Sequence, residues 1–104
     1  MKASEMQSGD MLLILNEIDN SARVWVKVRN DKVQGVDASV FVKNDELVKS
    51  QINNTEIPIM AFWAISDRYF DRLVAEELAY PVIDLKDAEA IASGRGFELP
   101  LLDW

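Results

Sequence analysis

Hydrophobic and polar residues alternate most regularly over Ala22–Arg29. Val24, Val26 and Val28 fall on one side of an extended chain, and larger polar or aromatic residues separate them. A period of two is typical of a strand with one buried face, because successive side chains of a strand point to opposite faces. This segment therefore predicts a β-strand.

Two further segments predict strands on either side of it. Met11–Leu15 is a continuous apolar run, and Val33–Lys43 places valine or alanine at alternate positions along most of its length. Turn residues at Asp19–Ser21 and Asn30–Asp31 would connect the three strands, and Gly35 would mark a bulge. The first half of the chain thus predicts an antiparallel meander.

Helical signals follow the meander. Asn44–Ile52 begins with capping residues and predicts a short helix. Ser66–Tyr80 predicts a longer helix, because its apolar residues recur at helical spacing. Asp84 can cap a last helix that runs through Ala92, with Gly94 as its C-terminal stop. The apolar residues of the longer helix are Phe70, Leu73, Val74 and Leu78.

Two segments predict the remaining strands. Glu56–Ile65 is apolar on both faces, so we expect an interior strand with Pro58 near its entry. Pro81–Leu85 predicts a short strand or extended segment. The pattern as a whole predicts an α+β fold, a mostly antiparallel sheet of four to five strands with two to three helices packed largely on one face. The length is that of a single globular domain, residues 1–104.

The composition removes most catalytic chemistry. None of the 104 residues is histidine or cysteine. The chain therefore lacks the commonest general base, a thiolate nucleophile, and imidazole or thiolate metal ligands. A carboxylate pair, a lysine with a lowered pKa, a tyrosine or an all-oxygen metal site stays open, but no spacing in the chain matches such a site. We expect a protein that is not an enzyme, with no catalytic or metal-ligating residues and no cofactor.

The charge is strongly negative. Eighteen acidic residues oppose eleven basic ones, which gives a net charge of −7, and residues 65–104 carry −5 of it. Such a surface repels nucleic acid and anionic membranes. The apolar runs are shorter than the roughly 20 residues of a membrane helix, and Met1–Asp10 shows no signal-peptide pattern. We expect a cytoplasmic protein that does not bind membranes.

The acidic residues of the second half are the first candidate site. They could dock a basic protein, because carboxylates steer association and then pair with lysine or arginine; the alternative is an ordinary solvated surface. Bacterial immunity proteins that block nuclease toxins are similar in character, being small, acidic, cytoplasmic and non-catalytic, although no motif carries this resemblance. It implies a partner that is a toxin, such as a nuclease, whose active site the chain covers. The predicted contact residues are Asp67, Asp71, Glu76, Glu77, Asp84, Asp87, Glu89 and Trp104.

A second candidate lies on the predicted strand face of Arg23, Trp25, Lys27 and Arg29. Some sheet-based modules hold single-stranded nucleic acid with such basic and aromatic side chains. The alternative is a solvated face on which Trp25 lies under a long basic side chain. Because the overall charge opposes nucleic acid, we rank a nucleic-acid-associated regulatory or accessory role second.

The C-terminal segment Phe97–Trp104 is apolar, and we expect it to dock on the domain. Trp104 can anchor an interface, where tryptophan is enriched, or close the core of its own domain. The sequence also leaves open a homo-oligomer that pairs through an edge strand or through this apolar segment.

Overall fold

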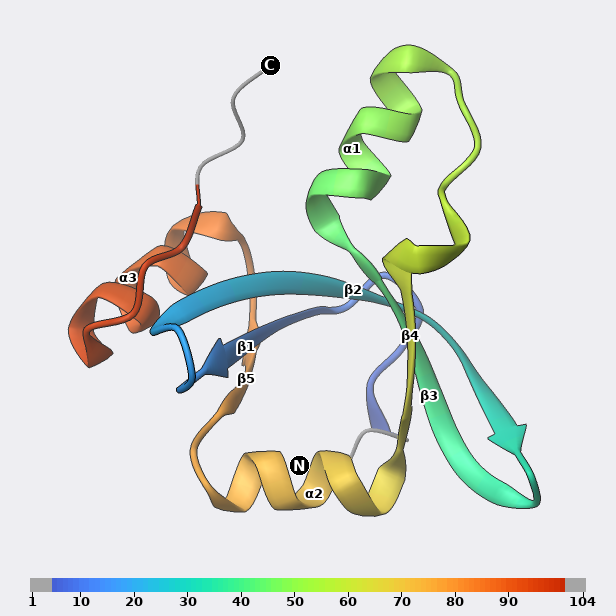
Figure 1. Ribbon diagram of the computed structural model, residues 1–104, viewed down its shortest axis with the longest axis horizontal. Helices are drawn as coiled ribbons and strands as arrows, with labels where there is room; N and C mark the ends of the chain where they lie inside the picture. Colours follow the sequence, from blue (N-terminus) through green and yellow to red (C-terminus); the bar gives the residue numbers. More distant parts are fainter. Residues whose placement is uncertain (1–4, 101–104) are drawn as a thin grey trace.

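The computed structural model describes residues 5–100 as an antiparallel sheet of five strands with three helices (Figure 1). The strand order is β4-β3-β2-β1-β5. The α+β class, the antiparallel sheet and the number of helices are as predicted. The strands are β1 (Met11–Asn16), β2 (Ser21–Val33), β3 (Val36–Lys43), β4 (Phe62–Ser66) and β5 (Ala79–Val82). The helices are α1 (Asn44–Asn53), α2 (Asp67–Ala75) and α3 (Leu85–Arg95), and a short 3-10 turn, η2 (Ile59–Ala61), precedes β4.

The meander of β1, β2 and β3 is confirmed, but its second turn lies further along the chain than predicted. β2 continues to Val33, and Gln34 and Gly35 form a two-residue turn with φ angles of 53° and 81°. Two successive positive φ angles match the twist of a tight hairpin, and glycine adopts such angles without strain. The turn predicted at Asn30–Asp31 and the bulge predicted at Gly35 are therefore wrong.

The bulge of this hairpin falls between Lys27 and Arg29. Lys27 lies opposite Phe41 and Arg29 lies opposite Val40, so Val28 is an extra residue on β2. Phe41 and Val40 are neighbours on β3 and face opposite sides of the sheet. The bulge therefore moves Arg29 to the face opposite Lys27, which ends the regular alternation predicted for this strand.

β4 lies at an edge of the sheet and pairs with β3. The prediction of an interior strand over Glu56–Ile65 is therefore wrong. The first part of this segment forms a loop and the η2 turn, and its apolar side chains include Ile59, 87% exposed, and Met60, 85% exposed. The unbroken apolar run thus reflects apolar side chains at the surface and not a strand buried on both faces.

The helices α2 and α3 begin where their capping residues predict. The Ser66 hydroxyl accepts a hydrogen bond from the Tyr69 backbone N–H at 3.1 Å. The Asp84 carboxylate accepts one from the Asp87 backbone N–H at 2.8 Å. These caps satisfy N–H groups that the first turn of a helix leaves without an intrahelical partner. The predicted starts at Ser66 and Asp84 are confirmed.

The ends of these helices differ from the prediction. α2 ends at Ala75, well before Tyr80, because the chain turns there to enter β5. α3 continues through Gly94 to Arg95, and the residue that stops it is Gly96, with a φ angle of 80°. A glycine inside the last turn does not end a helix unless the backbone there takes the left-handed conformation.

The hydrophobic core lies between the sheet and the helices α2 and α3, while α1 has no buried residue. α2 packs on β3, β4 and β5, and its Phe70 ring stacks on Phe41 of β3 with ring centroids 6.3 Å apart. α3 packs on β2 and β5, and its buried residues are Ala88 and Ala92. Figure 1 shows α2 well apart from both α1 and α3. The helices α2 and α3, each of which carries two acidic and two basic residues, therefore cover different parts of the sheet.

The C-terminal segment docks on the domain as far as the structure describes it. The Ala22 backbone N–H donates a hydrogen bond to the Glu98 carbonyl at 2.8 Å, beside the start of β2. Phe97 and Leu99 are partly buried against the core. Trp104, one of the predicted contact residues, lies outside the described residues.

Candidate protein-binding surface

Three of the predicted contact acids have partners within the fold. Asp67 accepts a hydrogen bond from the buried Ser39 hydroxyl at 3.2 Å. Asp84 caps α3, and Asp87 accepts a hydrogen bond from the Ile83 backbone N–H at 3.1 Å. These carboxylates stabilise helix starts and a buried hydroxyl, so a partner would have to compete for them.

Four other predicted contact acids are exposed. Within residues 5–100 their side chains form no hydrogen bond or ion pair. α3 does not lie alongside α2, so the structure does not extend the acids of α2 along α3 (Figure 1). These four acids are Asp71, Glu76, Glu77 and Glu89.

Many of the basic side chains, by contrast, have partners. Lys27 is 2% exposed, and its Nζ donates a hydrogen bond to Asn30 Oδ1 at 2.7 Å. Burial lowers the pKa of Lys27, and the carboxylates of Asp67 and Asp10 oppose that shift.

Ion pairs join Arg23 to Asp45 at 3.0 Å, Arg29 to Asp31 at 3.6 Å and Lys32 to Asp37 at 3.9 Å. Each ion pair cancels one charge of each sign, so most of the charge left unpaired at the surface is negative.

The chain forms a tight left-handed cap where α2 ends. The Leu78 backbone N–H donates to the Leu73 carbonyl at 2.8 Å, and the Glu77 N–H donates to the Val74 carbonyl at 3.1 Å. Glu77 takes the left-handed conformation between them, with a φ angle of 59°. This pair of hydrogen bonds satisfies carbonyl groups at a helix end, and the left-handed residue in it is usually glycine. We call Glu76–Leu78 the acidic turn.

Glutamate is an unfavourable choice for the acidic turn. A left-handed conformation costs a residue that has a Cβ about 1–2 kcal/mol. Glu76 and Glu77 also place two carboxylates at the C-terminal end of α2, where the helix dipole disfavours negative charge. Strained residues concentrate at functional sites, where the surrounding structure holds them in place. The acidic turn is therefore a candidate contact site.

Contacts from α3 hold this turn. Arg95 Nη1 donates to the Glu77 carbonyl at 3.1 Å and to the Tyr80 hydroxyl, and its guanidinium lies 5.8 Å from the centre of the Tyr80 ring. These contacts fix the backbone of the turn and leave the side chains of Glu76 and Glu77 exposed. The turn thus presents two carboxylates on a backbone that is tied to a second helix.

The predicted basic strand face does not form. Arg23 lies at the surface but pairs with Asp45. Lys27 is buried, and the bulge puts Arg29 on the other face of the sheet. Of the three predicted cations, Arg23 remains beside Trp25 on an exposed face. The arrangement expected for single-stranded nucleic acid is therefore not assembled on β2.

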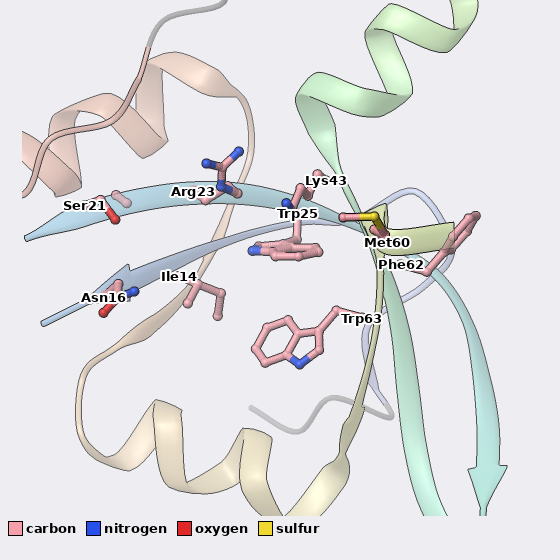
Figure 2. A pocket seen from close by; sticks show the side chains of 10 residues that line it. Ile14, Asn16, Ser21, Arg23, Trp25, Lys43, Met60, Phe62 and Trp63 are labelled. Atoms are coloured by element: carbon pink, nitrogen blue, oxygen red, sulfur yellow. The ribbon is translucent and has the colours of Figure 1, made fainter. Parts of the chain in front are cut away.

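Trp25 instead contacts Trp63 of β4 at the floor of an open hollow (Figure 2). The two rings are tilted by 49° with centroids 5.2 Å apart, and Lys43 Nζ lies 6.0 Å from the centre of the Trp25 ring. The hollow has a volume of about 390 Å³ and can accept an apolar or aromatic side chain. Its other lining residues are Ile14, Asn16, Ser21, Ala22, Arg23, Met60 and Phe62.

Within residues 5–100, no group of three acidic side chains is placed to hold a metal ion. No described helix is both long and apolar enough to cross a membrane. No family model, curated protein or solved structure matches the chain. The candidate surface is therefore identified from the positions and contacts of its residues alone, and the acidic turn is its most distinctive part.

Proposed function

We propose that this chain is a small, non-catalytic binding protein that neutralises a basic protein partner, in the manner of immunity proteins that block toxins such as nucleases. The acidic turn carries the proposal. Glu77 holds a strained conformation there, and both carboxylates of the turn are exposed. Glycine would relieve the strain, so the presence of glutamate is best explained by what its side chain binds.

The distribution of charge supports a basic partner. The net charge is −7, and exposed acids without ion pairs lie on α2, at its end and on α3. A negative field of this kind speeds association with a cationic surface. Asp71 and Glu89 contribute to this long-range attraction, while Glu76 and Glu77 make the close contacts. We expect the protein to act in the cytoplasm, as its sequence pattern predicts.

The rigidity of the acidic turn suits it to close contacts. Side chains on a fixed backbone lose less conformational freedom on binding than side chains on a mobile loop. Arg95 holds the Glu77 carbonyl, so the two carboxylates start from defined positions. Lysine or arginine residues around a partner's active site would pair with them, and the carboxylates would take the place of the phosphates of a nuclease substrate.

The test is affinity capture from cells of the source organism, at low and then at high salt. The bait is the wild-type chain or the double variant Glu76→Lys/Glu77→Lys. We expect the wild type to retain a basic protein that high salt releases and whose activity the wild type inhibits. The variant should bind that protein at least about tenfold more weakly, because like charges then face each other.

The matched control is Glu17→Lys/Glu56→Lys. Both residues are exposed, neither forms an ion pair within residues 5–100, and the total change in charge is the same. The control should keep nearly all of the binding. An equal loss in the two variants would contradict a contact site at the acidic turn, and failure to retain any basic protein would contradict the proposed function.

A further inference from the structure

β4 presents an unprotected sheet edge. Its residues Phe62–Ser66 pair with β3 on one side, and within residues 5–100 no strand pairs with the other side. Natural sheet edges are usually protected by charged side chains, proline or a bulge. β4 contains no charged residue and no proline, whereas the opposite edge strand β5 carries Pro81, which cannot donate a backbone hydrogen bond.

Apolar side chains are exposed around this edge. Ile59 is 87% exposed, Met60 85% and Phe62 38%, and the whole segment Ile57–Ile65 carries no charge. An exposed apolar area beside a free strand edge marks a site where another chain binds. A basic partner would be drawn to carboxylates, which this edge lacks, so β4 is unsuited to the partner of the acidic turn.

We infer that β4 pairs with β4 of a second copy of this chain, antiparallel across a two-fold axis at Ala64. In that register the two Ala64 residues face each other, and Trp63 of each copy lies opposite Ile65 of the other. A small, exposed side chain at the axis permits close approach, and on the same face the exposed Phe62 of each copy lies opposite Ser66 of the other. The edge is thus complementary to itself, as a two-fold interface requires.

The net charge of the chain determines whether salt strengthens or weakens the pairing of two copies. Each copy carries −7, so two copies repel each other at long range. Salt screens that repulsion and leaves the apolar contact along β4 in place. Pairing of two copies should therefore become stronger as salt rises, whereas salt weakens the binding of a basic partner at the acidic turn. The two interactions are distinguishable by this sign.

Sedimentation velocity of the full chain tests the inference, over a range of protein concentrations at low and high salt. We expect a monomer–dimer equilibrium in which the dimer fraction rises with both protein and salt. Ala64→Lys, at an exposed position, puts two ammonium groups opposite each other at the axis. It should raise the dissociation constant of the dimer by about tenfold or more.

Ile18→Lys is the matched control, because it makes the same change in charge at a turn residue that is 97% exposed. It should dimerise as the wild type does, and circular dichroism should show both variants folded. A wild-type chain that stays monomeric at both salt concentrations would overturn the inference. Dimerisation of Ala64→Lys as tight as that of the wild type would also overturn it.

Discussion

The ends of α2 and α3 have the same backbone geometry and different residues. At the end of α3 the Phe97 N–H donates to the Ala92 carbonyl at 2.8 Å, and Gly96 takes the left-handed conformation with a φ angle of 80°. At the end of α2, Leu78 makes the corresponding hydrogen bond to Leu73 and Glu77 takes the left-handed position. One helix thus ends on the residue that suits this conformation best, and the other ends on an acidic residue that does not.

The difference separates what the backbone requires at a helix end from what the proposed contact requires. Gly96 needs no explanation beyond the backbone, because glycine is the least strained residue there. Glu77 gains nothing from the backbone or from the helix dipole, and the proposed contact of its side chain with a basic partner would supply a reason for it. Exchanging the residues at the two ends tests whether the left-handed backbone alone sets their cost, and removing the contacts that join the ends tests whether α3 holds the turn.

The largest effect is expected from Gly96→Glu, which makes the end of α3 resemble that of α2. No atom outside its neighbours lies within 4 Å of an added Cβ, so the cost is that of the left-handed backbone. We expect the free energy of unfolding to fall by about 1–2 kcal/mol, measured by urea unfolding. Gly94→Glu is the control, because Gly94 is helical and equally open, and glutamate should stabilise the helix there. Equal effects at the two positions would contradict this account.

Arg95→Met should give the next largest effect, because Arg95 joins the two helix ends. It removes the hydrogen bonds to the Glu77 carbonyl and the Tyr80 hydroxyl. We expect a loss of about 1 kcal/mol in urea unfolding and faster hydrogen exchange at the Leu78 amide. Lys86→Met, at an exposed residue in the first turn of α3, should leave both unchanged. Unchanged exchange at Leu78 in the Arg95 variant would mean that the turn is not held from α3.

Glu77→Gly should stabilise the protein and weaken its binding to the proposed basic partner. Relief of the left-handed strain outweighs the greater freedom of glycine in the unfolded chain, which leaves a gain of about 0.5–1 kcal/mol. Glu77→Ala is the control, because it removes the carboxylate and keeps the strain. The alanine variant should bind as weakly as the glycine variant, but it should not show the gain in thermal stability of the glycine variant. A glycine variant less stable than the alanine variant would show that the turn is unstrained.

Glu76→Gln should have the smallest effect on stability. It removes a negative charge from the C-terminal end of α2, which should raise the free energy of unfolding by about 0.3–0.5 kcal/mol at low salt. The gain should shrink at high salt, because salt screens the helix dipole. Glu89→Gln, in the middle of α3, is the control and should show no such gain. A gain that persists at high salt would exclude the dipole as its cause.

Much of the fold follows from the pattern of residues, because its signals are local. The alternation in β2 and the capping residues Ser66 and Asp84 act through the nearest few residues of the chain. The misplaced features depend on distant partners. The bulge at Lys27 is set by the register against β3, and the edge position of β4 is set by the order of the strands. The residues of β2 do not by themselves indicate the bulge, and the residues of β4 do not by themselves indicate its edge position.

The residues of the candidate site could be predicted from the sequence, but their backbone conformation could not. Glu76 and Glu77 belong to the predicted acidic surface, yet nothing in two adjacent glutamates indicates a left-handed backbone. The available signal was the spacing of Leu73 and Leu78, since an apolar contact of this kind accompanies such helix ends. The contact between Trp25 and Trp63 had no such signal, because β3 separates their strands.

The contact between Trp25 and Trp63 also gives the sheet a built-in optical reporter. Two indoles at 5.2 Å and 49° couple as chromophores and split their circular dichroism band. Since the pair reaches across β3, the split band requires β2, β3 and β4 to keep their register. Detachment of β4 would remove the split band and leave the helical signal in place. The opening of this edge of the sheet can therefore be followed without any attached label.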